Sequence, residues 1–366
     1  MSIWRWAALL NELDHITPEA RITLGEGDTP LLHSRQIGPG AGLDGLLFKL
    51  ETTNPSGSYK DRFAAAAVSD MVARGKTRCI ATSSGNTGAA LAAYCAALPE
   101  LDCELAVLDT TPAGKLHQMI AYGARVNRVR GFGVDPDITS RVMEHLRTLA
   151  DRPDAALQIS AFHFSPIGMS GVETISFELA EQATHGIDHV FVPVGGGGLA
   201  LAVARGFARL QQQGRLARPV SVHCVQPDGN DTIASPLRDG SERAHDVTCT
   251  SQISGLQVAN VIDGHETIAA CRASGGTGHL VSDESVWQVQ ACLAQKEGVY
   301  CEPAGAVALA GALDAAERGI IDRQGNIVCL VTGSAFKDPP SVQRMIADVE
   351  TPVICIDELQ RQAIRK

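Results

Sequence analysis

The chain has 366 residues, of which 45% are hydrophobic and only 4% aromatic, and its formal net charge at pH 7 is −10. This length exceeds one ordinary domain and predicts two α/β lobes whose cores are built mainly from Ala, Val, Leu and Ile. The negative charge argues against nonspecific binding to nucleic acids or membranes, although it allows a locally basic pocket for a small anion.

The ends, cysteines and histidines of the sequence bear on compartment and metal binding. Residues 1–10 are too short and mixed for a signal-peptide core, and no stretch approaches the ~18 apolar residues of a membrane-spanning helix. The ten cysteines are scattered without a CxxC pair, which is typical of reduced thiols in a cytoplasmic protein. The eleven histidines show no metal-binding spacing. We therefore expect a cytoplasmic protein without a metal site.

The first half of the chain alternates strand-like and helix-like segments. The sequence predicts a short buried strand at residues 79–82 and further strands at 104–108 and near 125–129. Helices are predicted directly after Lys60 and at residues 87–97 and 114–122.

The second half continues the same alternation. Strands are predicted at residues 189–194, 220–225 and 327–331, and helices at 173–182, from the glycine run to about 211, and from Pro303 towards Gly319. Residues 226–284 are polar and irregular and remain unassigned. Repeated βα units predict an α/β fold of two parallel-sheet lobes with a cleft between them. We place a small domain at residues 51–159 and a large domain at residues 1–50 plus 160–366.

The segment NPSGSYKDR, residues 54–62, contains a lysine with unusual surroundings. Pro55 and Gly57 indicate a turn, so Lys60 lies at the start of the helix that follows. Backbone N–H groups there oppose the ammonium charge and favour the neutral amine, which is the form that attacks an aldehyde. Taken alone, a lysine in this position is more often an ordinary solvated charge.

The longer strings resolve that ambiguity, because several motifs resemble those of threonine synthases. The lysine segment resembles NPTGSFKDR, and LGEGDTPL at 24–31 matches the family's opening LxEGxTPL. CEPAGAV at 301–307 resembles CEPASAA, and VTGSAFKDP at 331–339 resembles VTGHGLKDP. The matches occur in order over residues 24–339. The resemblance implies a fold type II pyridoxal-phosphate enzyme, a homodimer, with the cofactor in the cleft.

The resemblance also implies roles for individual residues. Lys60 would be the catalytic residue and would carry pyridoxal 5'-phosphate as a Schiff base. Asn86, in the string TSSGNTG, would hydrogen-bond the ring hydroxyl of the cofactor. The loop formed by Ser84, Gly85, Asn86 and Thr87 would bind the substrate carboxylate, in keeping with the anion-binding character of a helix N-terminus. Without the resemblance, this loop would read equally well as an ordinary N-cap turn.

The glycine run after the strand at 189–194 would bind the cofactor phosphate. Its members are Gly195, Gly196, Gly197, Gly198 and Leu199. Glycines let the backbone approach a phosphate and direct several N–H groups at its oxygens. The run also loosely matches a dinucleotide-binding fingerprint, which keeps a nucleotide-dependent oxidoreductase as an alternative, but no acidic residue follows about 20 positions on.

Thr332 follows the strand at 327–331, and by resemblance its hydroxyl would face the pyridine nitrogen. A neutral hydroxyl would not hold that nitrogen protonated. The ring would then be a weaker electron sink, which favours elimination over racemisation or transamination. Lys60, Asn86 and Thr332 occur together, which argues against a second alternative, a pseudoenzyme that binds cofactor without turnover.

The implied activity is that of a lyase or synthase of amino-acid biosynthesis, acting at Cβ or Cγ of an activated amino acid. Threonine synthases carry a GNxGN loop where this chain has PVGGGGL, which is more similar to serine and threonine dehydratases. A dehydratase and a β-replacement synthase of the cysteine-, cysteate- or diaminopropionate-forming type therefore remain alternatives.

One further departure concerns the substrate phosphate. The family segment NSxNPxRLEGQKT, whose arginine pairs with that phosphate, corresponds here to FHFSPIGMSGVET at 162–174, and the arginine position holds Gly168. Arg62 and Lys337 are the residues that could compensate. We expect O-phosphohomoserine to be a poor substrate, because a bidentate guanidinium is hard to replace.

Overall fold

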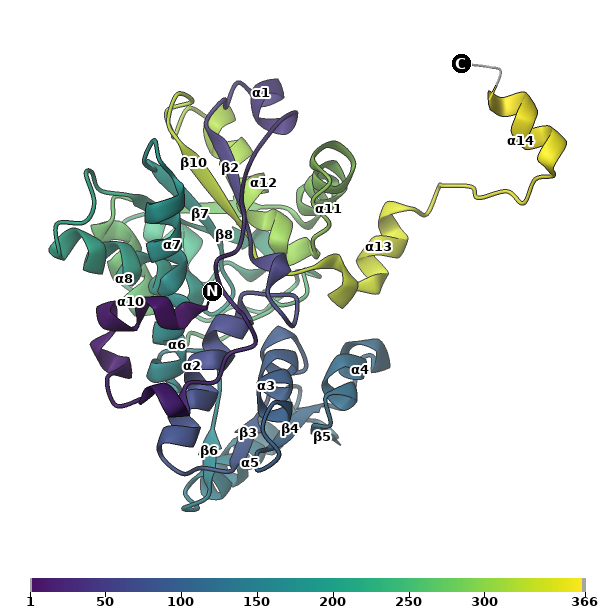
Figure 1. Ribbon diagram of the computed structural model, residues 1–366. Coiled ribbons are helices and arrows are strands. Elements are labelled where there is room, and N and C mark those ends of the chain that lie inside the picture. Colours follow the sequence, from purple (N-terminus) through teal and green to yellow (C-terminus); the bar gives the residue numbers. More distant parts are fainter. Residues whose placement is uncertain (1, 364–366) are drawn as a thin grey trace.

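The computed structural model describes residues 2–363, which form two α/β units, each built on its own sheet (Figure 1). The six-stranded sheet has the order β1-β2-β10-β7-β8-β9 and the four-stranded sheet the order β5-β4-β3-β6. The strands of the larger sheet are β1 Leu31–His33, β2 Leu46–Leu50, β10 Ile327–Val331, β7 His189–Pro193, β8 Ser221–Pro227 and β9 Gly278–Val281. Those of the smaller sheet are β5 Arg125–Val129, β4 Asp102–Leu108, β3 Arg78–Ala81 and β6 Ala155–Leu157.

Only β1 and β2 pair antiparallel among these strands, so the predicted parallel architecture is confirmed. The predicted strands correspond, in chain order, to β3, β4, β5, β7, β8 and β10. The sequence did not predict β1, β2, β6 and β9. Of these, β6 has the sequence AAL, which is too short and too poor in β-branched residues to give a strand signal.

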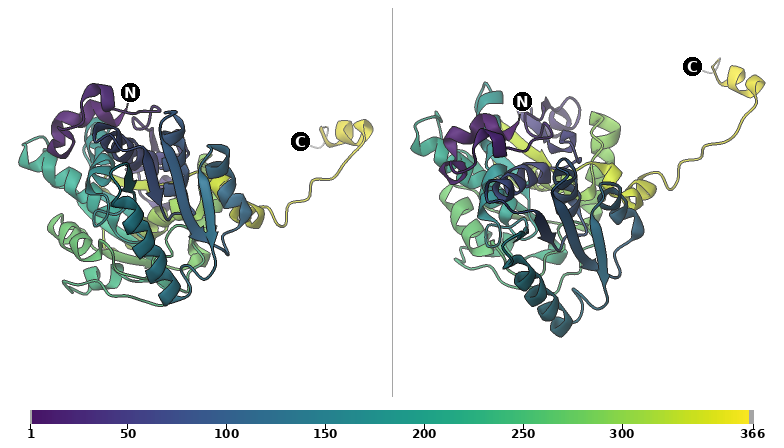
Figure 2. Two further views of the ribbon diagram at one scale, coloured as in Figure 1. Left: turned by 90° about the horizontal axis from the view of Figure 1, so that it is seen from below. Right: turned by 60° about the horizontal axis from the view of Figure 1, so that its bottom comes forward.

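Helices cover both sheets (Figure 2). Around the smaller sheet these are α2 Lys60–Ala73, α3 Asn86–Ala96, α4 Ala113–Ala121 and α5 Pro136–Ala150. The main helices of the larger unit are α6 Pro166–Val172, α7 Thr174–Gln182, α8 Gly198–Gln212, α10 Gly264–Ala273, α11 Asp283–Cys292 and α12 Pro303–Glu317. The short helices are α1 Ile37–Ala41, α9 Ala234–Arg238 and α13 Pro339–Met345, and beyond α13 the chain extends away from the body to α14 Ile356–Ala363 (Figure 1).

The start and stop signals of α12 act as predicted. Pro303 occupies the first helical position, where its missing N–H costs nothing. Gly319, at φ 66°, adopts the left-handed conformation two residues after the helix ends. In the unassigned stretch, α9, α10 and β9 form, while residues 241–263 contain no helix or strand.

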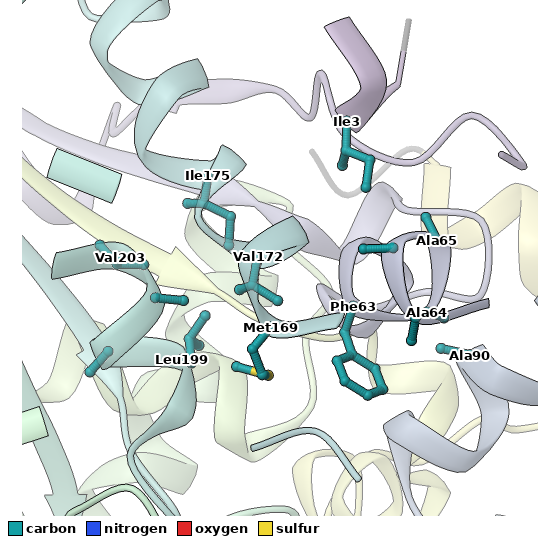
Figure 3. Packing of buried hydrophobic residues seen from close by; sticks show 14 of the residues in the cluster. Ile3, Phe63, Ala64, Ala65, Ala90, Met169, Val172, Ile175, Leu199 and Val203 are labelled. Atoms are coloured by element: carbon teal, nitrogen blue, oxygen red, sulfur yellow. The ribbon is translucent and has the colours of Figure 1, made fainter. Parts of the chain in front are cut away.

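The largest core joins the two units and is rich in small side chains (Figure 3). Helices α2 and α6 pack closely within it: a Cβ added at Gly171 would lie 2.5 Å from the carbonyl oxygen of Arg62. One added at Gly168 would lie 2.6 Å from Cε2 of Phe63. Glycine is therefore required at both positions, and the start of α2 is held firmly against the larger unit.

Within residues 2–363, no helix combines the length and the apolar character that crossing a membrane requires.

Candidate active site

Lys60 begins α2, and its amine is held by the Ser160 hydroxyl, which in turn contacts the Thr87 hydroxyl. Nζ of Lys60 donates to Oγ of Ser160 over 2.7 Å, and Oγ of Ser160 lies 2.8 Å from Oγ1 of Thr87. Loss of hydration lowers the pKa of Lys60 to about 7, against the opposing effect of the Asp263 and Glu302 carboxylates. A large fraction of Lys60 is therefore neutral near pH 7, which is the nucleophilic and basic form.

The rest of the lysine motif is fixed by buried hydrogen bonds. The carboxylate of Asp61 accepts from the backbone N–H and the hydroxyl of Ser56. The guanidinium of Arg62 is completely buried and pairs with Glu51 and Glu178. These contacts hold the first turn of α2 from both sides, so the position of Lys60 is set by residues that do not themselves reach its amine.

The same motif is attached to the end of β10, where Thr332 lies. The backbone N–H of Tyr59 donates to the carbonyl oxygen of Thr332 over 3.0 Å. Ser58 forms an isolated antiparallel bridge with Gly333. The Thr332 hydroxyl has no hydrogen-bond partner among the described residues, although Thr332 is largely buried. It is therefore available to a bound group.

Asn86 is the first residue of α3, and its side chain reaches across to the larger unit. Its Nδ2 donates to Oε1 of Glu302 over 2.8 Å. Burial raises the pKa of Glu302 to about 7, against the stabilising charge of Lys337 and the hydrogen bond from Asn86. One hydrogen of the Asn86 amide is thus engaged, and the second remains free for a ligand.

The loop before α3 offers several donors at a helix N-terminus. In the described part of the chain, the backbone N–H groups of Ser84, Asn86 and Thr87 donate to no protein acceptor, whereas that of Gly85 bonds to the Ser83 hydroxyl. Unpaired N–H groups at the start of a helix bind anions such as carboxylates.

The glycine run connects β7 to α8 and forms a second set of free donors. Within residues 2–363, none of the five consecutive backbone N–H groups from Gly195 to Leu199 donates to a protein acceptor. Gly197 has φ 99°, and a Cβ there would lie 2.4 Å from Oγ1 of Thr267. Buried donors without partners are costly, and a phosphate would satisfy several at once.

Asp263 lies beside this run and braces the loop that carries Ser160. Its carboxylate accepts from the backbone N–H groups of Phe162 and His163, over 2.8 and 3.0 Å. A Cβ at Gly198 would lie 3.0 Å from Oδ2 of Asp263 and 3.5 Å from the carbonyl oxygen of Ser160. Burial raises the pKa of Asp263.

These contacts bring the sequence-predicted residues into one site. Lys60 is linked to the Asn86 loop through Ser160 and Thr87, and Asp263 lies beside both the glycine run and the Ser160 loop. Thr332 is tied to the lysine motif by the backbone hydrogen bond from Tyr59. Ser160, Asp263 and Glu302 were not among the site residues predicted from the sequence. Glu302 lies inside the motif at 301–307 and could have been found there, whereas Ser160 and Asp263 lie in loops without a recognisable pattern.

The chain matches the family model described as pyridoxal-phosphate dependent enzyme over residues 22–333. It is 32% identical over 350 residues to a threonine synthase from Methanocaldococcus jannaschii, covering 94% of this chain and 82% of that protein. It is 31% identical over 346 residues to a threonine synthase from Mycobacterium tuberculosis, covering 92% and 91%.

Solved structures with the same fold include enzymes that are named for other activities. A threonine deaminase isoform from Solanum lycopersicum superposes with a TM-score of 0.73 at 24% identity, covering 94% of each chain. A serine racemase from Dictyostelium discoideum gives 0.68 at 21% identity, covering 91% of this chain and 98% of that one. At these identities the similarity concerns the fold.

Proposed function

Because the chain belongs to the pyridoxal-phosphate-dependent enzyme family, we propose that it acts on an activated amino acid by elimination or replacement at Cβ or Cγ. The enzyme class, a pyridoxal-phosphate-dependent lyase or synthase similar to threonine synthases, and the cofactor are as the sequence predicted. When bound, pyridoxal 5'-phosphate supplies an electron sink for the carbanion at the substrate Cα.

The residues present fit this cofactor. The five free N–H groups from Gly195 to Leu199 would hold its phosphate, and Lys60 would bind it covalently. The free hydrogen of the Asn86 amide would meet the ring hydroxyl, and the Thr332 hydroxyl would meet the pyridine nitrogen. The observation that carries the proposal is that a lysine with a lowered pKa and a run of five backbone N–H groups without protein acceptors share one site.

Lys60 also fits the role of the base that removes the α-proton. Its Nζ is placed by Ser160, whose hydroxyl contacts Thr87 in the carboxylate-binding loop. The substrate carboxylate would bind at Ser84, Gly85, Asn86 and Thr87, which brings the substrate Cα towards the amine. A positioned base with a pKa near the working pH is the efficient arrangement for proton transfer.

Position 168 bears on the leaving group of the substrate, because Gly168 stands where threonine synthases have a phosphate-binding arginine. The Phe63 ring fills the space in which a side chain at 168 would lie. The two candidate replacements are committed elsewhere: Arg62 is buried between Glu51 and Glu178, and Lys337 donates to Gln118 over 2.8 Å. We therefore favour a substrate without a phosphate, as for a threonine or serine dehydratase or a β-replacement synthase.

The proposal extends to organisation and location. We propose a small domain at residues 51–159 and a large domain formed by 1–50 and 160–366, a homodimer, and a cytoplasmic enzyme acting on a small amino acid. All ten cysteines are free thiols, which supports a reducing compartment. Light scattering on the purified holoenzyme tests the dimer.

A substrate screen tests the function. The holoenzyme is mixed with threonine, serine, O-acetylserine, O-phosphoserine and O-phosphohomoserine, and the change in cofactor absorbance is followed together with release of ammonia, 2-oxo acid, acetate or phosphate. The Lys60→Ala variant should lose turnover and should retain no cofactor after borohydride reduction. Lys76→Ala, at a half-buried lysine whose amine donates to the carbonyl oxygen of Arg152, is the control. Near-normal turnover of Lys60→Ala without added amine would remove Lys60 from this role.

A further inference from the structure

A second cluster of reactive side chains lies in the smaller unit, at the end of α3 opposite to Asn86. Cys79 on β3 and Cys103 on β4 are direct partners in the parallel register, and Cys95 is the penultimate residue of α3. The three Sγ atoms all lie within 4.8 Å of one another, and all three residues are buried. No other such group of three potential metal ligands converges in the described chain.

We propose that Cys79, Cys95 and Cys103 form a binding site for a soft metal cation with a filled d shell, such as Cu(I). The site is separate from the proposed active site and does not depend on its function. Thiolate–metal bonds of about 2.3 Å in a trigonal site place the sulfurs about 4.0 Å apart. The observed spacing of at most 4.8 Å closes to this by small side-chain rotations.

The choice of a soft cation follows from the ligand set. Each residue offers one sulfur, and the converging group contains no carboxylate or imidazole. Thiolates select Cu(I) and other soft cations over Mg²⁺ or Ca²⁺, which require oxygen ligands. Binding releases the thiol protons to solvent as the metal–sulfur bonds form, and no electron transfer is involved.

The cluster is accessible from the surface. A cavity of about 130 Å³ is lined by Cys95 and Cys103, with Arg78 and Arg125 among its other walls. Cys103 is the more exposed of these two cysteines, at 8% against 1% for Cys95. A cavity of this volume has room for a small ion.

Another pair of buried cysteines provides a comparison within the same chain. Cys224 and Cys271 lie with their sulfurs 3.4 Å apart, both fully buried, and the described residues supply no third ligand there. Two thiols packed in a core are ordinary small apolar contacts. Cys271, on α10, is therefore a matched control for Cys95 on α3.

The test uses the full-length holoenzyme in which the three more accessible thiols, Cys249, Cys292 and Cys355, are changed to serine. Cadmium(II) is added anaerobically under reducing conditions, free metal is removed by desalting, and bound cadmium is measured by elemental analysis and by sulfur-to-metal charge-transfer absorption. We expect about one retained cadmium per chain, a raised melting temperature with the metal, and displacement of the cadmium by Cu(I).

Two cysteine variants test whether the three-cysteine cluster holds the cadmium. Loss of a residue that hydrogen-bonds a metal ligand lowers metal affinity roughly tenfold to a hundredfold. Loss of a ligand itself, in Cys95→Ala, should lower the cadmium affinity by at least that much, whereas Cys271→Ala should leave the cadmium affinity unchanged. Unchanged cofactor absorbance shows that each variant is folded, and Cys103→Ser repeats the test if Cys95→Ala does not fold. Failure of the parent to retain cadmium, or equal retention in the Cys95 and Cys271 variants, would overturn the proposal.

Discussion

Asn86 and Glu302 are joined by a hydrogen bond of 2.8 Å from Nδ2 to Oε1, which connects the start of α3 to the residue before α12. One Nδ2 hydrogen of Asn86 is engaged by the Glu302 carboxylate. The second Nδ2 hydrogen is the one left for a ligand. Glu302 is in turn tied to the end of β10, since its backbone N–H donates to the carbonyl oxygen of Gly333. The pair thus links both units at the proposed cofactor ring.

We expect Glu302→Ala to weaken cofactor binding by about tenfold or more, the value of one hydrogen bond to a charged group. Asn86→Ala should have a similar effect. The two losses should not add in the double variant, because Glu302 acts through Asn86. Titration of each apo-protein with cofactor measures the dissociation constants, and Glu302→Gln, which keeps an acceptor, is the conservative control. Additive losses would show that Glu302 acts independently.

The lowered pKa of Lys60, about 7, predicts the pH dependence of cofactor uptake. The reactive form is the neutral amine, which accumulates as the pH rises through the pKa. The rate of uptake by the apo-protein should therefore rise up to about pH 7 and then level off. An ordinary lysine, with a pKa near 10.4, would show a continuing rise. Stopped-flow absorbance between pH 6 and 9 distinguishes them, and a rate still climbing at about pH 9 would contradict the assignment.

Gly196→Asp should weaken cofactor binding strongly while leaving the fold intact. A Cβ at Gly196 meets its nearest neighbour, Val258, at 3.4 Å, so the position has room for a side chain. The added carboxylate would repel a phosphate dianion. Gly196→Ala is the matched control, because it adds the Cβ without the charge. Cofactor retention on dialysis should be low for the Asp variant and higher for Ala, and normal retention by Gly196→Asp would place the phosphate elsewhere.

O-phosphohomoserine should be a poor substrate, with kcat/KM below about 10⁴ M⁻¹s⁻¹, the lower end of the ordinary range. The double change Phe63→Gly with Gly168→Arg should improve it, because removing the ring takes away the closest contacts of the new side chain and leaves Cβ of Ala67 as the nearest neighbour, 3.0 Å from the new Cβ. A guanidinium can then pair with the phosphate. Gly168→Arg alone should destabilise the protein, since the side chain meets Phe63. Steady-state kinetics decide, and efficient wild-type turnover of this substrate would restore a plain threonine synthase.

Glu178→Gln should reduce the free energy of unfolding by about 3–5 kcal/mol. Glu178 pairs with both Arg62 and Lys49 in a fully buried cluster, and the change leaves two buried cations under-compensated. Chemical denaturation measures the loss. Glu181→Gln is the control, because its partner Arg5 lies at the surface, and surface pairs contribute little. Equal effects of the two changes would mean that the buried cluster is not important for stability.

Local sequence patterns predicted the strands with apolar runs and the site residues that lie in recognisable motifs. The strands that became β3, β4 and β7 each contain at least three consecutive apolar residues. Lys60, Asn86 and the glycine run lie in motifs whose strings can be recognised. Residues 241–263 could not be predicted because they form neither helix nor strand. Their course is set by side-chain contacts such as Asp263 with the backbone at residues 162 and 163, which join segments about 100 positions apart.

The missed site residues illustrate the same limit. Ser160 matters because Lys60, far from it in sequence, folds to within 2.7 Å, and no property of its own neighbourhood indicates this. The absence of an arginine at 168 was visible in the sequence. Only the tertiary contacts show that Phe63 fills the space beside Gly168. The same holds for the pairing of Arg62 with Glu51 and for the hydrogen bond of Lys337 to Gln118.

The close approach of α2 and α6 constrains how this enzyme can change by mutation. Position 168 can grow only if position 63 shrinks, and either step alone passes through an overpacked or hollowed core that costs stability. Variants with a different substrate would therefore require replacements at both positions 63 and 168. The first of the two replacements would be tolerated only in a protein whose stability exceeds what folding requires. A library of single substitutions at these positions would miss them, whereas one that varies both together would sample folded proteins with altered sites.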